Sequence, residues 1–196
     1  MTGHTELING EALERTLDRM ALQILECTAS SGEGGLLEDG GLALVGIHRG
    51  GVPLAERLKA RLDRHLGDTP VPLGKVDITL YRDDATIGLP QPIVGPTELD
   101  FDITGRNLVL VDDVLYTGRT VRAALDALTD FGRPRRILLA VLLDRGHREL
   151  PIQPDVVGLT VTTKCDEEVE VELTELGADT DRVVVRAGGR PNPGGL

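Results

Sequence analysis

Apolar runs that end in polar, glycine-containing turns recur along this chain. Residues 42–47, 108–111 and 136–143 are short runs of mainly aliphatic side chains. Runs of this length are typical of strands that are buried on both faces of a parallel sheet. Residues 74–80 alternate instead between apolar and polar positions, which indicates a strand with one exposed face. The pattern predicts an α/β fold with a largely parallel central sheet.

Helical spacing is found between these strands, so the sheet is expected to be flanked by helices. Residues 11–26 repeat apolar side chains at intervals of three and four, and a second helix with the same spacing follows residue 51. A third begins beyond residue 118, and its predicted apolar face consists of Val121, Ala124, Leu125, Leu128 and Phe131. Closer to the C-terminus, residues 168–173 alternate as an edge-like strand with which residues 182–186 are expected to pair.

Three segments lack this periodicity. Residues 28–41 are rich in Ser, Gly and acids, and are expected to form a mobile insertion. Residues 81–105 are rich in Pro, Gly and acids, and so long a loop in a compact domain is usually functional. We expect it to be a flexible lid that excludes water from a site beneath it, with a disordered connection as the alternative. Residues 188–196 are expected to be a frayed tail.

The chemistry of the chain is concentrated just after the apolar run 108–111. Asp112 and Asp113 follow that run and precede a turn that contains Thr117, Gly118 and Thr120. Unpaired backbone N–H groups at a helix start attract phosphate, glycine allows close approach and the threonines add hydroxyl donors. The two acids suit sugar hydroxyls, or Mg²⁺ held through hydroxyls or water. A phosphorylated sugar is therefore favoured, with a simple helix cap as the alternative; the P-loop pattern is missing.

A second strand-turn-helix unit has a similar composition. The run 42–47 leads into His48, Arg49, Gly50 and Gly51. An arginine can hold a diphosphate, and glycines let the backbone come close to it. The alternative is an ordinary strand-to-helix turn that uses glycine for its geometry, and for this turn alone that alternative is favoured. The diphosphate-binding turn is favoured over it only because the acidic motif occurs in the same chain.

Composition limits the classes of function. The length of 196 residues fits one domain, residues 1–196, and the aromatic content of 2% requires an aliphatic core. The net charge of −11 repels nucleic acid, so any RNA binding needs a locally basic face. Cys27 and Cys165 lack metal-site spacing and are expected to be free thiols in a reducing compartment. Without a signal peptide or membrane-spanning run, a cytoplasmic location is expected.

The string from residue 108 to residue 120 resembles the phosphoribosyl pyrophosphate (PRPP) motif of type I phosphoribosyltransferases. Together with residues 77–84 and 144–152, it resembles more narrowly the PyrR family of pyrimidine operon regulators and uracil phosphoribosyltransferases. The resemblance implies the type I phosphoribosyltransferase fold, with a small base-binding hood over residues 144–163. It also implies Mg²⁺-dependent formation of UMP and diphosphate from uracil and PRPP, UMP-dependent attenuation through pyrimidine operon leader RNA, and a homo-oligomer.

The resemblance also implies roles for individual residues. Asp112 and Asp113 would hold the ribose hydroxyls and position Mg²⁺, and Arg82 would close over the diphosphate. The 5′-phosphate and ribose would be bound by Tyr116, Thr117, Gly118, Arg119 and Thr120; the diphosphate by His48, Arg49 and Gly50; and uracil by Arg145, His147 and Val161. Because a phenol at Tyr116 is a weak base at neutral pH, catalysis is expected to depend on orientation and charge stabilisation.

Departures from the family pattern concentrate on the RNA side. Arg15, Arg19 and Arg148 remain as candidate RNA contacts, but Asp18, Leu22, Cys27, Gln153 and Leu159 occupy positions where the family usually has other residues. Each lost phosphate contact weakens RNA binding, and Asp18 adds repulsion. Two alternatives stay open: an RNA-binding nucleotide sensor with weak catalysis, and a flavodoxin-like domain for another phosphate ligand.

Overall fold

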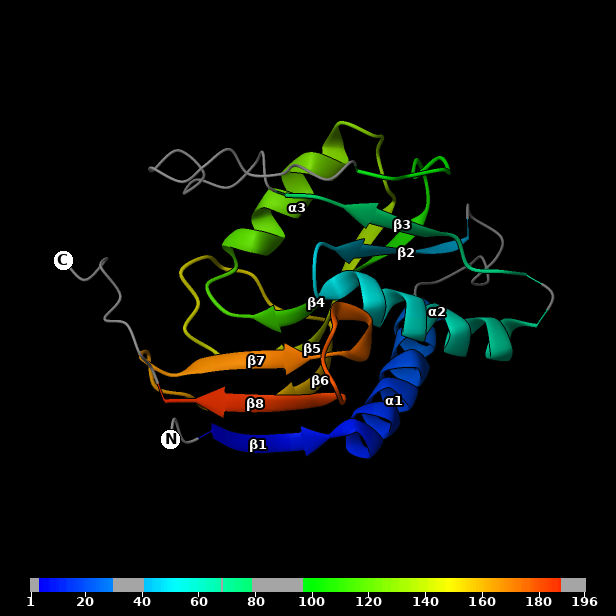
Figure 1. Cartoon of the computed structure of the whole chain (residues 1–196). Helices are drawn as coiled ribbons and strands as arrows, with labels where there is room; N and C mark the ends of the chain where they lie inside the picture. Colours follow the sequence, from blue (N-terminus) through cyan, green and yellow to red (C-terminus); the bar gives the residue numbers. More distant parts are fainter. Residues whose placement is uncertain (1–3, 30–40, 68, 79–96, 188–196) are drawn as a thin grey trace.

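A computed structural model describes residues 4–29, 41–67, 69–78 and 97–187 (Figure 1). Along the chain the elements are β1 (His4–Asn9), α1 (Gly10–Ala29), β2 (Leu42–Ile47), α2 (Gly51–Leu66), β3 (Leu73–Val76), β4 (Asn107–Leu115), α3 (Arg119–Thr129), β5 (Arg136–Asp144), β6 (Val156–Thr160), β7 (Glu168–Glu172), the 3₁₀ turn η2 (Thr174–Leu176) and β8 (Arg182–Arg186). In this described part of the chain, no helix combines the length and the apolar character needed to cross a membrane.

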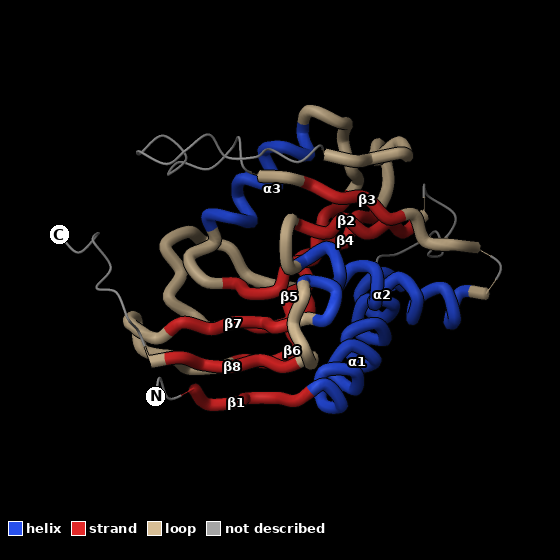
Figure 2. The backbone as a smooth tube through the Cα atoms, in the orientation of Figure 1, coloured by secondary structure: helices blue, strands red, loops and turns tan. Residues whose placement is uncertain are grey.

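The central sheet has five strands in the order β3-β2-β4-β5-β6, which are drawn in red in Figure 2. Every neighbouring pair in this sheet is parallel. The predicted α/β fold with a largely parallel sheet is therefore confirmed. The chain enters the sheet at β2, adds β3 on one side, and returns to add β4 on the other side. In sheets with this order, ligands bind beyond the carboxyl ends of the strands where the direction of winding changes. That position lies between β2 and β4.

The aliphatic strands bury both of their faces, as their composition requires. Alternate residues of β2 divide between two cores, with Leu44 facing α1 and α2 and Val45 facing α3. Figure 1 shows the same layering, with α3 on the opposite side of the sheet from α1 and α2. The predicted helical faces fit this arrangement, except that Phe131 lies beyond the end of α3 and is 45% exposed.

A second, three-stranded antiparallel sheet has the order β1-β8-β7. The predicted pairing of residues 168–173 with 182–186 is confirmed, with Glu168 opposite Arg186 and Glu172 opposite Arg182. Ion pairs join the strands, including one of 2.6 Å between Arg182 Nε and Glu172 Oε2. The N-terminal strand β1 pairs with β8 and was not predicted, because its sequence is short and mostly exposed.

Other boundaries differ from those expected. Strand β4 continues through the acidic pair to Leu115, so the two acids lie within its last residues rather than beyond it. Strand β6 was not predicted, because Gly158 interrupts a short apolar run. Most of the predicted lid and Arg82, most of the 28–41 insertion and the predicted tail lie outside the described residues.

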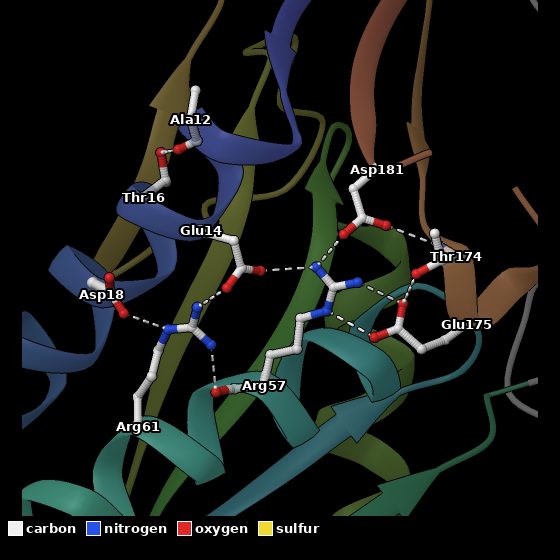
Figure 3. A network of polar contacts seen from close by, with 9 residues as sticks. All are labelled: Ala12, Glu14, Thr16, Asp18, Arg57, Arg61, Thr174, Glu175 and Asp181. Atoms are coloured by element: carbon white, nitrogen blue, oxygen red, sulfur yellow. Dashed lines mark hydrogen bonds and ion pairs between the residues drawn. The ribbon is translucent and has the colours of Figure 1, made fainter. Parts of the chain in front are cut away.

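Arg57 and Arg61 of α2 bind carboxylates of α1 and of the segment between β7 and β8, and we call this network the arginine clamp (Figure 3). Arg57 binds both carboxylate oxygens of Glu175 at 2.7 and 2.6 Å, Asp181 at 2.6 Å and Glu14 at 3.1 Å. Arg61 binds Asp18 at 2.7 Å and also Glu14. Hydrogen bonding to Arg57 lowers the pKa of the Glu175 and Asp181 carboxyls. The clamp thus joins α1, α2 and the segment between β7 and β8.

Candidate active site

The two glycine-containing turns meet at the carboxyl ends of β2 and β4. Gly50 precedes α2, and a Cβ atom there would overlap the Asp113 carboxylate of β4. A Cβ atom at Gly51 would likewise overlap the carbonyl oxygen of Val111. The backbone N–H of His48 donates to Val76 O at 3.0 Å, which fixes the same turn to β3. The predicted diphosphate turn and the predicted acidic pair are therefore in direct contact, and only glycine fits between them.

The acidic pair lies at the innermost part of this site. Asp112 is 5% exposed, and its side-chain oxygen accepts the backbone N–H of Asp113 at 3.0 Å. Asp113 is half-buried and its own carboxylate accepts the backbone N–H of Val114 at 2.8 Å. Burial, and then the nearby charge of Asp113, raise the pKa of the Asp112 carboxyl well above its usual range. Such a pair favours a partner that brings positive charge or hydroxyl donors.

The turn after β4 has the geometry of an anion-binding helix start. Gly118 has a φ of 92°, which favours glycine, and α3 begins at the next residue. The Thr117 hydroxyl accepts the backbone N–H of Arg119 at 3.4 Å. The Arg119 guanidinium contacts Glu149 at 2.7 Å, so it lies beside the turn, and Thr120 is half-buried in the first helical turn. This turn follows the carboxyl end of β4, four to five residues after the acidic pair.

The loop after β5 covers the turn after β4. Backbone N–H groups of Glu149 and Leu150 donate to Thr117 O at 3.0 and 3.2 Å. The guanidinium of Arg145 lies 4.1 Å from the centre of the Tyr116 ring, and the His147 ring meets the same ring edge-on at 5.8 Å. The two segments that were predicted to bind the base and the 5′-phosphate therefore pack against each other.

A cavity of about 380 Å³ opens beside this loop, and its lining includes the three residues predicted to contact uracil: Arg145, His147 and Val161. Arg145 is 7% exposed and directs its guanidinium at Thr163 Oγ1 (3.1 Å) and at Glu167 O (2.7 Å). The cavity is also lined by Thr160, Thr162 and Thr163, which the sequence analysis did not single out. A prediction of strand β6 would have pointed to these threonines, because a hydroxyl-rich run begins at the last residue of that strand.

The candidate RNA contacts already have partners within the protein. Arg15 is ion-paired with Glu11, and Arg19 donates to the backbone carbonyls of Val157 (3.1 Å) and Gly158. Arg148 has a 15% exposed side chain and donates to Asp144 Oδ2 at 2.6 Å and to Tyr116 O at 3.0 Å. Their roles in RNA binding stay predictions.

Comparisons with known proteins agree with this geometry. A model of the phosphoribosyl transferase domain matches residues 4–176. The protein named Bifunctional protein PyrR from Thermus aquaticus is 54% identical over 179 residues, which cover 91% of this chain and 93% of that protein. Its namesake from Roseiflexus sp. is 50% identical over 183 residues, covering 93% and 95% of the two chains.

Solved structures show the same fold at lower identity. A hypoxanthine phosphoribosyltransferase from Trypanosoma cruzi, a mutant in a ternary substrates complex, superposes with a TM-score of 0.69 and 19% identity, covering 97% of this chain and 96% of that one. A hypoxanthine-guanine phosphoribosyltransferase from Bacillus anthracis gives a TM-score of 0.64, also at 19% identity, with coverage of 95% and 99%. With half of its residues shared along nearly its whole length, the chain belongs to the PyrR family of phosphoribosyltransferases.

Proposed function

We propose that this protein is a uracil phosphoribosyltransferase, which joins uracil to the ribose 5-phosphate of PRPP and releases diphosphate. One observation carries the proposal: Gly50 of the diphosphate turn lies against the Asp113 carboxylate, at the same edge of the sheet as the cavity lined by Arg145 and His147. A PRPP molecule needs a diphosphate site, a ribose site and a 5′-phosphate site in sequence, and a base site must adjoin them. The proposed diphosphate turn touches the acidic pair and the proposed base loop touches the turn after β4, which supports this arrangement.

Each segment has a distinct task in the proposed reaction. The turn from Thr117 to Thr120 would hold the 5′-phosphate, and the acidic pair would accept hydrogen bonds from the ribose hydroxyls. The β2–α2 turn with Arg49 would bind the leaving diphosphate. The stack of Arg145 on the Tyr116 ring joins the proposed base loop to the proposed phosphate turn, and it would set the distance between uracil and ribose. Catalysis would come from orientation and from stabilisation of charge as diphosphate departs.

The acidic pair fits a magnesium ion that arrives with PRPP. Carboxylate oxygens are ligands that Mg²⁺ prefers, and burial makes the negative charge of Asp112 costly without a cation. Among residues 4–29, 41–67, 69–78 and 97–187, no group of three or more His, Cys, Asp or Glu side chains is arranged to hold a metal. Substrate and water oxygens would therefore complete the coordination, and the ion would neutralise charge on the diphosphate.

A second proposed role is regulation of pyrimidine genes through leader RNA, consistent with relatives that are named bifunctional. Arg19 and Arg15 lie on α1, and Asp18 on the same helix is paired with Arg61. This pairing reduces the repulsion that Asp18 alone would exert on a phosphate. Filter binding to a pyrimidine leader stem-loop tests the role: UMP-enhanced, salt-sensitive binding is expected, and no binding at low salt would exclude it.

The enzymatic proposal is tested by product formation from PRPP and Mg²⁺ with different bases. UMP is expected from uracil, with no nucleotide formed from hypoxanthine or guanine. Product from the purines alone would overturn the substrate assignment, although the family membership would stand. Size-exclusion chromatography with light scattering on the same preparation tests the proposed homo-oligomer.

A further inference from the structure

A cysteine and a histidine lie together beside the candidate base cavity. Cys165 Sγ is 3.5 Å from His147 Nδ1, and the Cys165 side chain is exposed. His147 lines the cavity, whereas Cys165 follows the cavity-lining segment that ends at Thr163. The thiol is therefore accessible from solvent while it touches a residue of the cavity wall.

The hydrogen bonds of the histidine define what its ring presents to the thiol. His147 Nε2 lies 2.8 Å from the carbonyl oxygen of Thr163. Because a carbonyl oxygen only accepts, Nε2 must carry the hydrogen, and in the neutral ring Nδ1 then carries the lone pair. That lone pair faces Cys165. A base next to a thiol is the arrangement that activates a sulfur nucleophile.

The ring is also held from other sides. It meets the Tyr116 ring edge-on at 5.8 Å, and Arg145 covers the Tyr116 ring at 4.1 Å. Thr163 binds both His147 and Arg145: its carbonyl oxygen accepts a hydrogen bond from the His147 ring, and its hydroxyl accepts one from Arg145 at 3.1 Å. A group attached to Cys165 would lie next to the His147 ring, and a shift of that ring would alter the cavity wall.

We propose that Cys165 is a reversible thiol-modification site through which low-molecular-weight disulfides regulate the base cavity; this regulation rests on the proposed uracil phosphoribosyltransferase function. The Cys165 sulfur attacks one sulfur of the disulfide, and its proton passes to His147 Nδ1. An S–S bond to Cys165 forms as the S–S bond of the reagent breaks. The departing thiolate takes up the proton, so Cys165 is oxidised and one reagent sulfur is reduced. A dithiol reductant reverses the exchange.

The sequence provides an internal control. Cys27, the other cysteine of the sequence, is half-buried on α1 and packs against the core that α1 and α2 share. With 5,5′-dithiobis(2-nitrobenzoate), we expect the Cys165 thiol to react at least tenfold faster than the Cys27 thiol. Cys165→Ser should remove the fast phase, Cys27→Ser should leave it, and His147→Gln should slow it. A fast phase that persists in Cys165→Ser, or that His147→Gln does not slow, would overturn the assignment.

Regulation is tested on full-length protein treated with glutathione disulfide, with the site of modification read by mass spectrometry. The mixed disulfide should raise the KM for uracil at least fivefold, change the KM for PRPP much less, and be reversed by dithiothreitol. Cys165→Ser should keep the untreated rate and resist the treatment. An unchanged KM for uracil after complete modification would refute the regulatory role. If untreated protein makes no UMP, the proposed function fails. The site can then be tested without turnover: slower modification of Cys165 in the presence of UMP would support a link to the cavity, and an unchanged rate would refute it.

Discussion

Replacing Asp112 by asparagine is expected to stabilise the unliganded protein while abolishing UMP formation. The Asp112 side chain is 5% exposed, and burial together with the charge of Asp113 raises the pKa of its carboxyl. A carboxyl whose pKa rises on folding favours the folded state at acid pH, and this contribution is lost as the pH rises. At neutral pH the group therefore costs stability, because the unfolded chain hydrates a carboxylate that the folded chain buries.

The size of the effect follows from the burial. The buried Asp112 carboxylate accepts the backbone N–H of Asp113, and a buried polar group whose hydrogen-bonding capacity is only partly satisfied costs about 1–3 kcal/mol. For a chain of this size, each kcal/mol shifts the Tm by about 2–4 °C, so Asp112→Asn should raise the Tm by about 2–12 °C at neutral pH. The gain should shrink as the pH falls and vanish below about pH 4, where the carboxyl is protonated in both states.

Thermal unfolding of the wild type and of two variants between pH 4 and pH 8 measures this difference. Asp113→Asn is the matched control, because Asp113 is half-buried and reaches the turn after β2. It should lose UMP formation as well, but with a smaller gain in Tm, because it removes the charge of Asp113 and leaves the burial of Asp112 unchanged. Equal stabilisation by both substitutions, or a gain that does not depend on pH, would refute the argument from burial.

Three other predictions test the site and the clamp. Gly50→Ala places a methyl group on the neighbouring carboxylate, so the KM for PRPP should rise at least tenfold in steady-state assays, while circular dichroism stays native. Val161→Phe should fill the cavity and raise the KM for uracil but not for PRPP, and equal increases would contradict that location. Arg57→Met leaves Glu175 and Asp181 without their cation and should cost about 1–2 kcal/mol in urea unfolding at pH 7, after allowance for partial exposure. Since Arg57 lowers both carboxyl pKa values, the loss should begin to shrink below about pH 4 and disappear only when both carboxyls are protonated in the folded protein; a constant loss would assign the effect to packing.

The sequence was most informative where one short segment determines both structure and chemistry. The aliphatic run before Asp112 and the glycine at position 118 predicted a strand, a turn and a helix, and the structure confirms all three. The glycine turn at His48 and the acidic motif were expected to bind parts of one PRPP molecule, and the structure places Gly50 against Asp113.

Other features depend on contacts between distant segments and left little local signal. Strand β1 forms only by pairing with β8, which lies at the other end of the described chain. The clamp depends on Arg57 meeting Glu175 across 118 positions, and no periodic pattern specifies such a meeting. The same holds for the contact of Cys165 with His147, because it requires the loops after β5 and β6 to converge.

The clamp has a practical consequence for the boundaries of recombinant versions of this protein. Asp181 and Glu175 lie late in the chain, yet they hold the helix whose first turn adjoins the Asp113 carboxylate. The central sheet is already complete at Thr160, so a truncated version that ends there would keep every strand of that sheet. It would nevertheless lose Glu175 and Asp181, two of the three carboxylates that bind Arg57. Expression boundaries should therefore extend through β8, even for studies that concern catalysis alone.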